Sequence, residues 1–307
     1  MRFRRSQGQR FSWDCPAEIG RLVLRNPVIA SAGTFGYGLE YEWYGDMRQL
    51  GAVIMKSLTV DPRPGFAPPR VTLLNDPPGS MRNAIGVPNP GVRAWAEETL
   101  PSMLALGAPV VASLWGVEEE AVLKAADLLS KYRGPIAWEV NLSCPNSEHE
   151  GSPVCHDPVA SARVCQEVRR LAPDDVGVWA KLSPDAPGVV EVGVACFDAG
   201  ADAVTISNSL PASHDDLIGQ SRLGGGAGGL SGPVLMEHVR PLIEKFTSSH
   251  PEVPIVACGG VTSSRIALDY LDLGARAVQI GTASLYDPRA CYKIAKGVVT
   301  ELTGRMK

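Results

Sequence analysis

The sequence predicts a (β/α)8 TIM barrel, because short apolar segments alternate with longer amphipathic segments along nearly the whole chain. Each apolar segment ends in glycine or polar residues, a pattern that is typical of strands buried on both faces. The predicted strands are 27–33, 52–57, 109–116, 136–143, 176–183, 201–209, 253–260 and 276–282. Parallel strands with helical returns in a chain of 307 residues are typical of this barrel.

Amphipathic segments connect most of these strands, and their apolar residues recur every three to four positions, as in a helix with one buried face. The predicted helices are 117–131, 158–172, 187–199, 233–249, 262–273 and 287–303. Two of them end in a glycine before the next strand, in DAGADAV (198–204) and LDLGARAV (271–278). A doubly wound sheet is the alternative, but it binds phosphate after its first strand, whereas paired glycines here follow the last two strands.

Two segments fall outside this repeat. Residues 1–21 are predicted to form an N-terminal arm, which is basic but has no apolar run of a secretory signal, and residues 22–307 form the barrel domain. A long insertion, 58–108, separates the second and third predicted strands and is rich in Pro and Gly. It is too long for a plain connection, so we expect it to be functional.

Composition excludes several classes of protein. The net charge is −4 and no basic patch is interleaved with aromatic residues, so we expect no nucleic acid partner. No apolar run reaches the length of a membrane span. The seven cysteines are scattered without CxxC or paired Cys/His spacing, which favours free thiols in a reducing cytoplasm. The adjacent Cys155 and His156 lack further ligands, so we expect no metal site there.

The carboxyl ends of the predicted strands define the candidate site, because TIM-barrel chemistry lies at that end. In chain order they carry Ala32-Gly33, Lys56-Ser57, Ser113, Asn141 with Cys144, Lys181, Asn208-Ser209, Gly259-Gly260 and Gly281-Thr282. This set contains no carboxylate pair, which argues against a glycosidase. It contains no histidine, which argues against a His-based triad or a His-ligated metal.

Glycines at the last two strand ends, in ACGGV and IGTAS, predict a phosphate site. Backbone N–H groups can approach a phosphate closely there, and this is the usual phosphate position of the fold. A third glycine run, GGGAGGLSGP (224–233), is expected to close over the same group. The alternative is that these glycines only shape tight turns.

Lys56 and Lys181 each follow a buried apolar strand, so neither is an ordinary solvated charge. Either could form a Schiff base with a carbonyl substrate, or stabilise an anion such as a reduced flavin or a carboxylate. Because no predicted strand end carries an acidic residue, we expect neither lysine to be neutralised by a salt bridge.

Four asparagines lie at strand ends or in loops: Asn83, Asn141, Asn146 and Asn208. An amide side chain offers both a donor and an acceptor without charge. Several of them around one pocket suit a planar ligand with alternating C=O and N–H groups, such as a pyrimidine. A single one would more often be a turn residue.

Taken in order, these motifs resemble the class 1 dihydroorotate dehydrogenases from about Leu22 to the C-terminal helix. The motifs are KS (56–57), MRNAIGVPNPG (81–91), NLSCPN (141–146), KLSP (181–184), SNS (207–209), GGLSGP (228–233), CGG (258–260) and IGT (280–282). The resemblance implies a cytoplasmic flavoprotein that contains FMN. It would oxidise (S)-dihydroorotate to orotate in de novo pyrimidine (UMP) biosynthesis.

Carried over by motif, the resemblance makes Cys144 the catalytic base. It implies FMN contacts from Ala32, Gly33, Lys56, Ser57, Ser113, Asn141, Lys181, Ser207, Gly232, Gly259, Gly260, Gly281 and Thr282. It implies substrate contacts from Lys56, Asn83, Ala84, Ile85, Gly86, Val87, Asn141, Asn146, Asn208 and Ser209. Three features depart from the family pattern. One is the loop LPASHDDLIGQSRL (210–223), which lacks the usual hydrophobic Gly-Met pattern. Ala32 offers only backbone groups because SAG replaces the usual ASG, and Ser113 stands where relatives often have Asn.

Cys144 suits the role of base because it lies between polar residues and a proline, a poor place for a buried structural thiol. Oxidation of dihydroorotate removes a hydride from C6 and a proton from C5, and the proton needs a base on the face opposite the flavin. A free thiol has a pKa of about 8.5, so a lowered pKa or a proton relay, for example through Ser143, is required near neutral pH.

NAIGVPNPG and GGLSGP resemble the NAD-linked subclass, class 1B. This implies a homodimer with an iron–sulfur/FAD electron-transfer subunit as partner, since the chain itself has no iron–sulfur cysteine cluster and no GxGxxG loop. Fumarate is the other possible acceptor. A flavin-dependent dihydropyrimidine dehydrogenase is the nearest alternative, although such enzymes usually have His in place of Asn146. A Schiff-base lyase that uses Lys56 or Lys181 would leave Cys144 and the asparagines unexplained. A non-catalytic scaffold is disfavoured because every polar position that the chemistry requires is filled.

Overall fold

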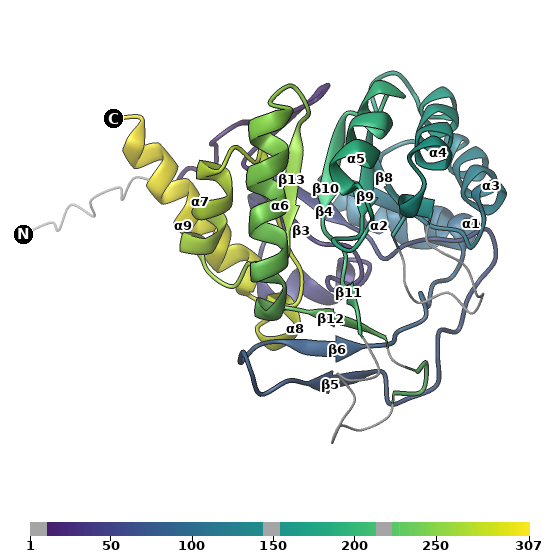
Figure 1. Ribbon diagram of the computed structural model, residues 1–307, viewed down its shortest axis with the longest axis horizontal. Coiled ribbons are helices and arrows are strands. Elements are labelled where there is room, and N and C mark those ends of the chain that lie inside the picture. Colours follow the sequence, from purple (N-terminus) through teal and green to yellow (C-terminus); the bar gives the residue numbers. More distant parts are fainter. Residues whose placement is uncertain (1–10, 144–153, 213–222, 227) are drawn as a thin grey trace, which may run out of the picture.

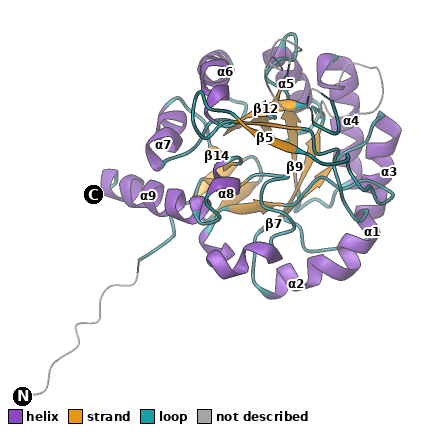
Figure 2. Ribbon diagram, turned by 90° about the horizontal axis from the view of Figure 1, so that it is seen from below, coloured by secondary structure: helices purple, strands orange, loops and turns teal. Residues whose placement is uncertain are grey.

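A closed parallel barrel of eight strands forms the centre of the molecule. The computed structural model describes residues 11–143, 154–212, 223–226 and 228–307. Helices surround the strands on the outside of the barrel (Figure 1, Figure 2). The TIM barrel predicted from the sequence is therefore confirmed.

Each barrel strand lies inside a segment that was predicted as a strand. They are β3 (Val28–Ala30), β4 (Ala52–Ile54), β7 (Val110–Leu114), β8 (Ala137–Asn141), β9 (Gly177–Leu182), β10 (Ala203–Ile206), β13 (Ile255–Cys258) and β14 (Ala277–Ile280). Every residue of these strands is buried, because helices cover the outside and side chains fill the inside. The strands pair in chain order, and β14 pairs with β3 to close the ring.

Each predicted helix is present, and each packs an apolar face on the barrel. The helices are α3 (Glu119–Ser130), α4 (Pro158–Leu171), α5 (Val189–Asp198), α6 (Met236–Ser249), α7 (Ser264–Asp272) and α9 (Ala290–Arg305). Local sequence sets their starts: the Asp157 carboxylate accepts hydrogen bonds from the N–H groups of Val159 and Ala160, and Pro158 occupies the first turn. No helix in the described part of the chain is long and apolar enough to cross a bilayer.

Shorter elements fill the connections. They are η1 (Leu39–Tyr44), η2 (Met47–Gln49), α1 (Val92–Ala94), η3 (Trp95–Thr99), α2 (Leu100–Ala105), η4 (Val154–His156), η6 (Pro233–Leu235) and α8 (Ala283–Tyr286). Of these, α8 follows β14 directly, so it lies at the carboxyl end of the barrel.

A hairpin closes the amino end of the barrel. Strands β1 (Ala17–Ile19) and β2 (Leu22–Leu24) pair antiparallel. Ile19 and Leu24 pack with interior barrel residues such as Ile54 and Trp179 in one buried cluster. The hairpin therefore plugs this end with apolar side chains and leaves the carboxyl end for the site.

A second sheet covers the carboxyl end, and we call it the roof. It has four antiparallel strands in the order β11 (Leu210–Pro211), β12 (Gly229–Ser231), β6 (Met81–Asn83) and β5 (Val71–Leu73). Figure 1 shows these strands together beside the barrel. Strands β5 and β6 belong to the long insertion, and β11 and β12 follow β10, so two distant segments build one layer.

The hairpin is fastened to the barrel by a buried carboxylate. Both carboxylate oxygens of Asp202 accept from the Arg21 Nε–H, at 2.8 and 2.9 Å, and Oδ2 also accepts from the Val178 N–H at 2.8 Å. We expect Asp202→Ala to lower the free energy of unfolding by about 1–3 kcal/mol, because it leaves buried donors unpaired. Urea unfolding measures this value.

Asp14→Ala is the matched control. Asp14 pairs with Arg25 at 2.8 Å, but its side chain is 64% exposed, so the loss should stay below about 1 kcal/mol. Equal losses in the two variants would show that the hairpin contact has no special weight.

Candidate active site

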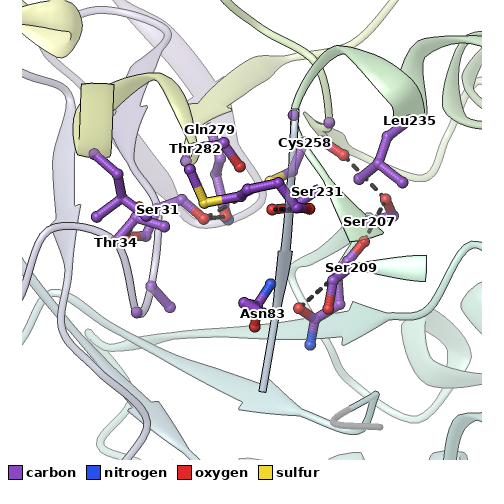
Figure 3. A pocket seen from close by; sticks show the side chains of 18 of the residues that line it. Ser31, Thr34, Asn83, Ser207, Ser209, Ser231, Leu235, Cys258, Gln279 and Thr282 are labelled. Carbon is purple, nitrogen blue, oxygen red and sulfur yellow. Dashed lines mark hydrogen bonds between the residues drawn. The ribbon is translucent and has the colours of Figure 1, made fainter. Parts of the chain in front are cut away.

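A cavity lies at the carboxyl ends of the barrel strands, under the roof. Its volume is about 350 Å³. Figure 3 shows side chains from strand ends, such as Gln279 and Ser207, and from the roof, such as Asn83 and Ser231, around one space. The insertion thus supplies part of the cavity wall, in keeping with the functional role that its length predicts.

Most of the residues predicted to contact a cofactor line this cavity. They are Ala32, Gly33, Lys56, Ser57, Asn141, Lys181, Ser207, Gly232, Gly259, Gly260, Gly281 and Thr282. Ser113 differs, since it is fully buried and its Oγ lies 2.8 Å from Ser57 Oγ. Ser113 therefore reaches the cavity through Ser57 rather than by lining it.

The predicted substrate contacts divide into three groups. The lining residues among them are Lys56, Asn83, Ile85, Val87, Asn141, Asn208 and Ser209. Ala84 and Gly86 belong to the same loop but face protein, because Ala84 is fully buried and a Cβ at Gly86 would lie 2.6 Å from Phe66 N. Cys144 and Asn146 lie outside the described residues.

Three glycine loops meet at one corner of the cavity. An added Cβ at Gly260 would lie 3.5 Å from the carbonyl oxygen of Gly232, and one at Gly232 would lie 3.2 Å from Thr282 Cγ2. Gly232 has φ +92° and a Cβ there would come within 2.6 Å of Gly79 O, so only glycine fits without strain. The structure thus brings together the three glycine segments that the sequence predicted to share one ligand.

The expectation that neither lysine has an acidic neighbour is wrong for Lys181. Its Nζ lies 3.7 Å from Oε1 of Glu139, and both side chains are buried. Glu139 lies within β8, two residues before Asn141, and not at the end of the strand. Side chains two apart on a strand share a face, so that period was the signal that would have found Glu139.

Other residues around Lys181 were also missed by the sequence reading. Lys181 Nζ donates to Ser31 Oγ at 3.4 Å and to Gln279 Oε1 at 3.3 Å, and both of these residues line the cavity. Figure 3 places Ser31 and Gln279 close together, and Ser31 Oγ donates to Gln279 Oε1 at 3.0 Å. Lys181 is therefore held at the cavity by uncharged side chains as well as by Glu139.

Lys56 lies in a different environment. It lines the cavity but forms no ion pair with a described carboxylate. Burial lowers the pKa of its ammonium, Glu40 opposes this shift and Arg70 adds to it. A partly desolvated cation without a partner is well suited to bind an anionic group of a ligand.

The asparagines from the barrel form a hydrogen-bonded cluster with Ser143. Asn141 Nδ2 donates to Ser57 Oγ at 3.1 Å, and Asn141 Oδ1 accepts from Ser143 Oγ at 3.1 Å. Asn208 Nδ2 donates to Ser143 Oγ at 3.0 Å. These bonds fix the amide orientations, so the cavity presents a defined pattern of uncharged donors and acceptors.

Comparison with known proteins identifies the family. The chain matches the profile of the family described as dihydroorotate dehydrogenase over residues 16–302. The chain belongs to the dihydroorotate dehydrogenase family. Members of this family are oxidoreductases that act on a CH–CH group. The resemblance to dihydroorotate dehydrogenases is therefore confirmed, and the comparisons do not support the dihydropyrimidine dehydrogenase or lyase alternatives.

Similar dihydroorotate dehydrogenases support the NAD-linked subclass. A protein of Geotalea uraniireducens is 38% identical over 94% of this chain and 93% of its own length. A protein of Geotalea daltonii is 38% identical over 96% and 98%. Both are named dihydroorotate dehydrogenase B (NAD(+)), catalytic subunit. The crystal structure of the Eimeria tenella enzyme in complex with ferulenol has the same fold, with a TM-score of 0.78 and 16% identity over 98% of this chain and 87% of that chain.

The environment of Lys56 predicts a pH effect on stability. Its pKa in the folded chain lies below the ordinary 10.5, so between these two values the unfolded chain binds more protons at this site. The free energy of unfolding therefore rises with pH in that window. Relative to Lys56→Met, the parent should gain stability toward pH 10.5, by less than about 1.4 kcal/mol per pH unit.

Urea unfolding of both proteins across this range measures the difference in slope. Lys124→Met is the control, because the hydrogen bond that the exposed Lys124 donates to Glu120 raises the pKa of this lysine. A parent and a Lys56→Met variant with parallel pH profiles would contradict the prediction.

Proposed function

We propose that the chain is an FMN-dependent dihydroorotate dehydrogenase that oxidises (S)-dihydroorotate to orotate, the step of de novo pyrimidine biosynthesis that the sequence resemblance implies, in the cytoplasm. One observation carries the proposal. A single cavity combines a glycine corner suited to a phosphate with two lysines and a cluster of asparagines suited to a flavin and an anionic pyrimidine. The family assignment agrees with this chemistry.

The residues present fit FMN. At the corner formed by Gly232, Gly260 and Thr282, backbone N–H groups would hold the phosphate. Gly33 would leave room for the cofactor, because an added Cβ there meets nothing within 4 Å. Lys181 would stand beside the ring system and supply positive charge. When bound, FMN would supply the hydride acceptor for the reaction.

The remaining contacts of the proposed cofactor site come from the strand ends. Ser57, supported by Ser113, and Asn141 would offer hydrogen bonds to the ring. The full proposed set is Ala32, Gly33, Lys56, Ser57, Ser113, Asn141, Lys181, Ser207, Gly232, Gly259, Gly260, Gly281 and Thr282.

The substrate would lie between the barrel and the roof. Lys56 and the backbone of the 83–87 loop would bind the C6 carboxylate, which distinguishes dihydroorotate from dihydrouracil. Uncharged groups would bind the ring C=O and N–H groups; they are Asn83, Asn141, Asn146, Asn208 and Ser209. An anion-binding end and a neutral end would orient the substrate in one direction.

Cys144 would remove the proton from C5. Its neighbour Ser143 is fully buried and is bonded to Asn141 and Asn208, so the chain enters this loop at the cavity. Cys258 is the only described cysteine that lines the cavity. Burial raises the pKa of the Cys258 thiol, which makes it a poor source of thiolate and leaves Cys144 as the candidate base.

The electron acceptor is proposed to be NAD, reached through a partner. The two relatives described above are named as catalytic subunits, and a second subunit with an iron–sulfur cluster and FAD would carry electrons onward. A homodimer of this chain is proposed as the core of such an assembly.

The purified chain should be yellow and release FMN on denaturation. It should oxidise dihydroorotate with a dye as acceptor, and with NAD only when the electron-transfer subunit is added. Turnover is followed with fumarate, NAD and the dye as separate acceptors, and with dihydrouracil as the alternative substrate. A colourless chain that does not take up FMN, or equal turnover of dihydrouracil, would refute the proposal.

Cys144→Ala should bind orotate nearly as the parent does but lose turnover by roughly 10²–10⁴-fold near neutral pH, since a general base contributes about this factor. Cys144→Ser should recover activity only at higher pH, because a hydroxyl group is a weaker base. Orotate titrations followed by the flavin spectrum measure binding, and dye reduction measures turnover. Full activity in Cys144→Ala would end the assignment.

A further inference from the structure

A carboxylate lies inside the barrel, directly behind the cavity. Glu139 on β8 has no exposed surface, and the cavity lining does not include it. Barrel interiors are normally filled by branched apolar residues. A buried carboxylate is costly unless it is paired and hydrogen-bonded. Lys181 has a place in the proposed cofactor site but Glu139 has none, so the burial of this carboxylate needs a physical explanation.

The donors and acceptors between Lys181 and Glu139 can be assigned in order, beginning with the Lys181 ammonium. An ammonium only donates, so the Gln279 atom that lies 3.3 Å from Lys181 Nζ must be the amide oxygen. The amide nitrogen of Gln279 then faces Glu139, 2.6 Å from Oε2. Because this nitrogen only donates, Glu139 Oε2 is the acceptor, as expected for a carboxylate.

Two hydroxyl groups complete the network with consistent direction. Ser31 Oγ accepts from Lys181 Nζ at 3.4 Å and donates to Gln279 Oε1 at 3.0 Å. Thr205 Oγ1 accepts from Gln279 Nε2 at 3.2 Å and donates to Glu139 Oε2 at 3.2 Å. A continuous chain of hydrogen bonds therefore connects the ammonium to the carboxylate.

The network leaves Lys181 with one N–H donor for a ligand. Nζ donates hydrogen bonds to Ser31 and Gln279, and it makes no third hydrogen bond to the described residues. Glu139 Oε1 likewise accepts no hydrogen bond from the described part of the chain and lies 3.7 Å from Lys181 Nζ. The carboxylate thus balances the charge of Lys181 without occupying its last donor.

We propose that Glu139 is a positioning residue for Lys181. Held by Gln279 and Thr205, it fixes the ammonium at the cavity with its charge balanced and one N–H donor directed to the bound cofactor. This inference rests on the proposed function, in which FMN occupies the cavity. Glu139 acts only through Lys181, since it does not line the cavity.

Glu139→Gln tests the role because it changes charge and donor pattern but not shape. Gln279 keeps its bond if the new amide oxygen replaces Oε2. The new amide nitrogen then takes the place of Oε1. Because this nitrogen and the Lys181 ammonium are both donors, they repel each other. Lys181 would be displaced, and the reduced cofactor, which carries more negative charge, would lose a stabilising partner.

The measurement is the midpoint potential of bound FMN, together with the dissociation constant of oxidised FMN. In Lys181→Met, the affinity for reduced relative to oxidised FMN should fall by roughly ten- to a hundredfold, the loss of one hydrogen bond to a charged group. Glu139→Gln should shift the midpoint potential in the same direction. Its affinity for reduced relative to oxidised FMN should fall by roughly tenfold. The double variant should match Lys181→Met alone, since the two residues act as one unit.

Asp202→Asn is the matched control. It makes the same change at another buried, ion-paired carboxylate, at the opposite end of the barrel. It should lower the thermal midpoint of unfolding and leave the potential unchanged. A purely structural role for Glu139 would give this same result.

The outcomes separate the two proposals. A parent chain that binds no FMN would overturn the proposed function and this inference with it. Two results in a parent that binds FMN would overturn the inference alone. In the first, Glu139→Gln leaves the midpoint potential unchanged. In the second, it shifts the potential by the same amount in the parent and in the Lys181→Met background. If Glu139→Gln does not fold, Thr205→Val replaces it, because it deletes one donor to Glu139 while keeping the side-chain shape. Thr205→Val should shift the midpoint potential in the same direction by a smaller amount, and it should cause no shift in the Lys181→Met background. The absence of a shift in Thr205→Val alone would overturn the inference.

Discussion

The pairing of β14 with β3 is the contact on which the rest of the structure depends, because it closes a parallel sheet into a ring. In a closed parallel sheet, all carboxyl ends lie on one rim. Side chains that are far apart in the sequence then meet there: Ser31 and Gln279, 248 positions apart, are hydrogen-bonded at 3.0 Å. The glycine corner, the two lysines and the asparagine cluster all result from this one closure.

Strand β8 shows how the rim separates two kinds of chemistry. Asn141 and Glu139 are two residues apart on one face of the strand, but they join different networks. Asn141 belongs to a neutral cluster with Ser143 and Asn208 at the cavity surface, and Glu139 belongs to a charged network beneath Lys181. The carboxylate that balances Lys181 is therefore buried below the cavity, whereas the neutral amides of Asn141 and Asn208 line its open space. Along β8, this arrangement presents defined polar groups to the cavity and leaves neither Lys181 nor Glu139 as an unbalanced buried charge.

The barrel could be predicted from the sequence because its signals are local. Each strand carries an apolar run, and each helix carries its own amphipathic period and end signals, such as Asp157 and Pro158. The hairpin at the amino end and the roof were not predicted, since their strands of two or three residues take their form from partners elsewhere in the chain. Most strand-end residues that were predicted to contact a ligand line the cavity, whereas Glu139 was missed because it lies inside a strand. The roles of Cys144 as catalytic base and of Asn146 as a substrate contact stay predictions.

The roof is built from segments that are distant in the sequence, and this affects how the protein must assemble. Asn83 on β6 pairs with Gly229 on β12, 146 positions later in the chain. Contacts of such high sequence separation are favourable only after the intervening chain has been ordered. During synthesis, we therefore expect the roof to form after most barrel strands have left the ribosome. The cavity wall, which includes roof residues such as Asn83 and Ser231, would then be completed only late in synthesis.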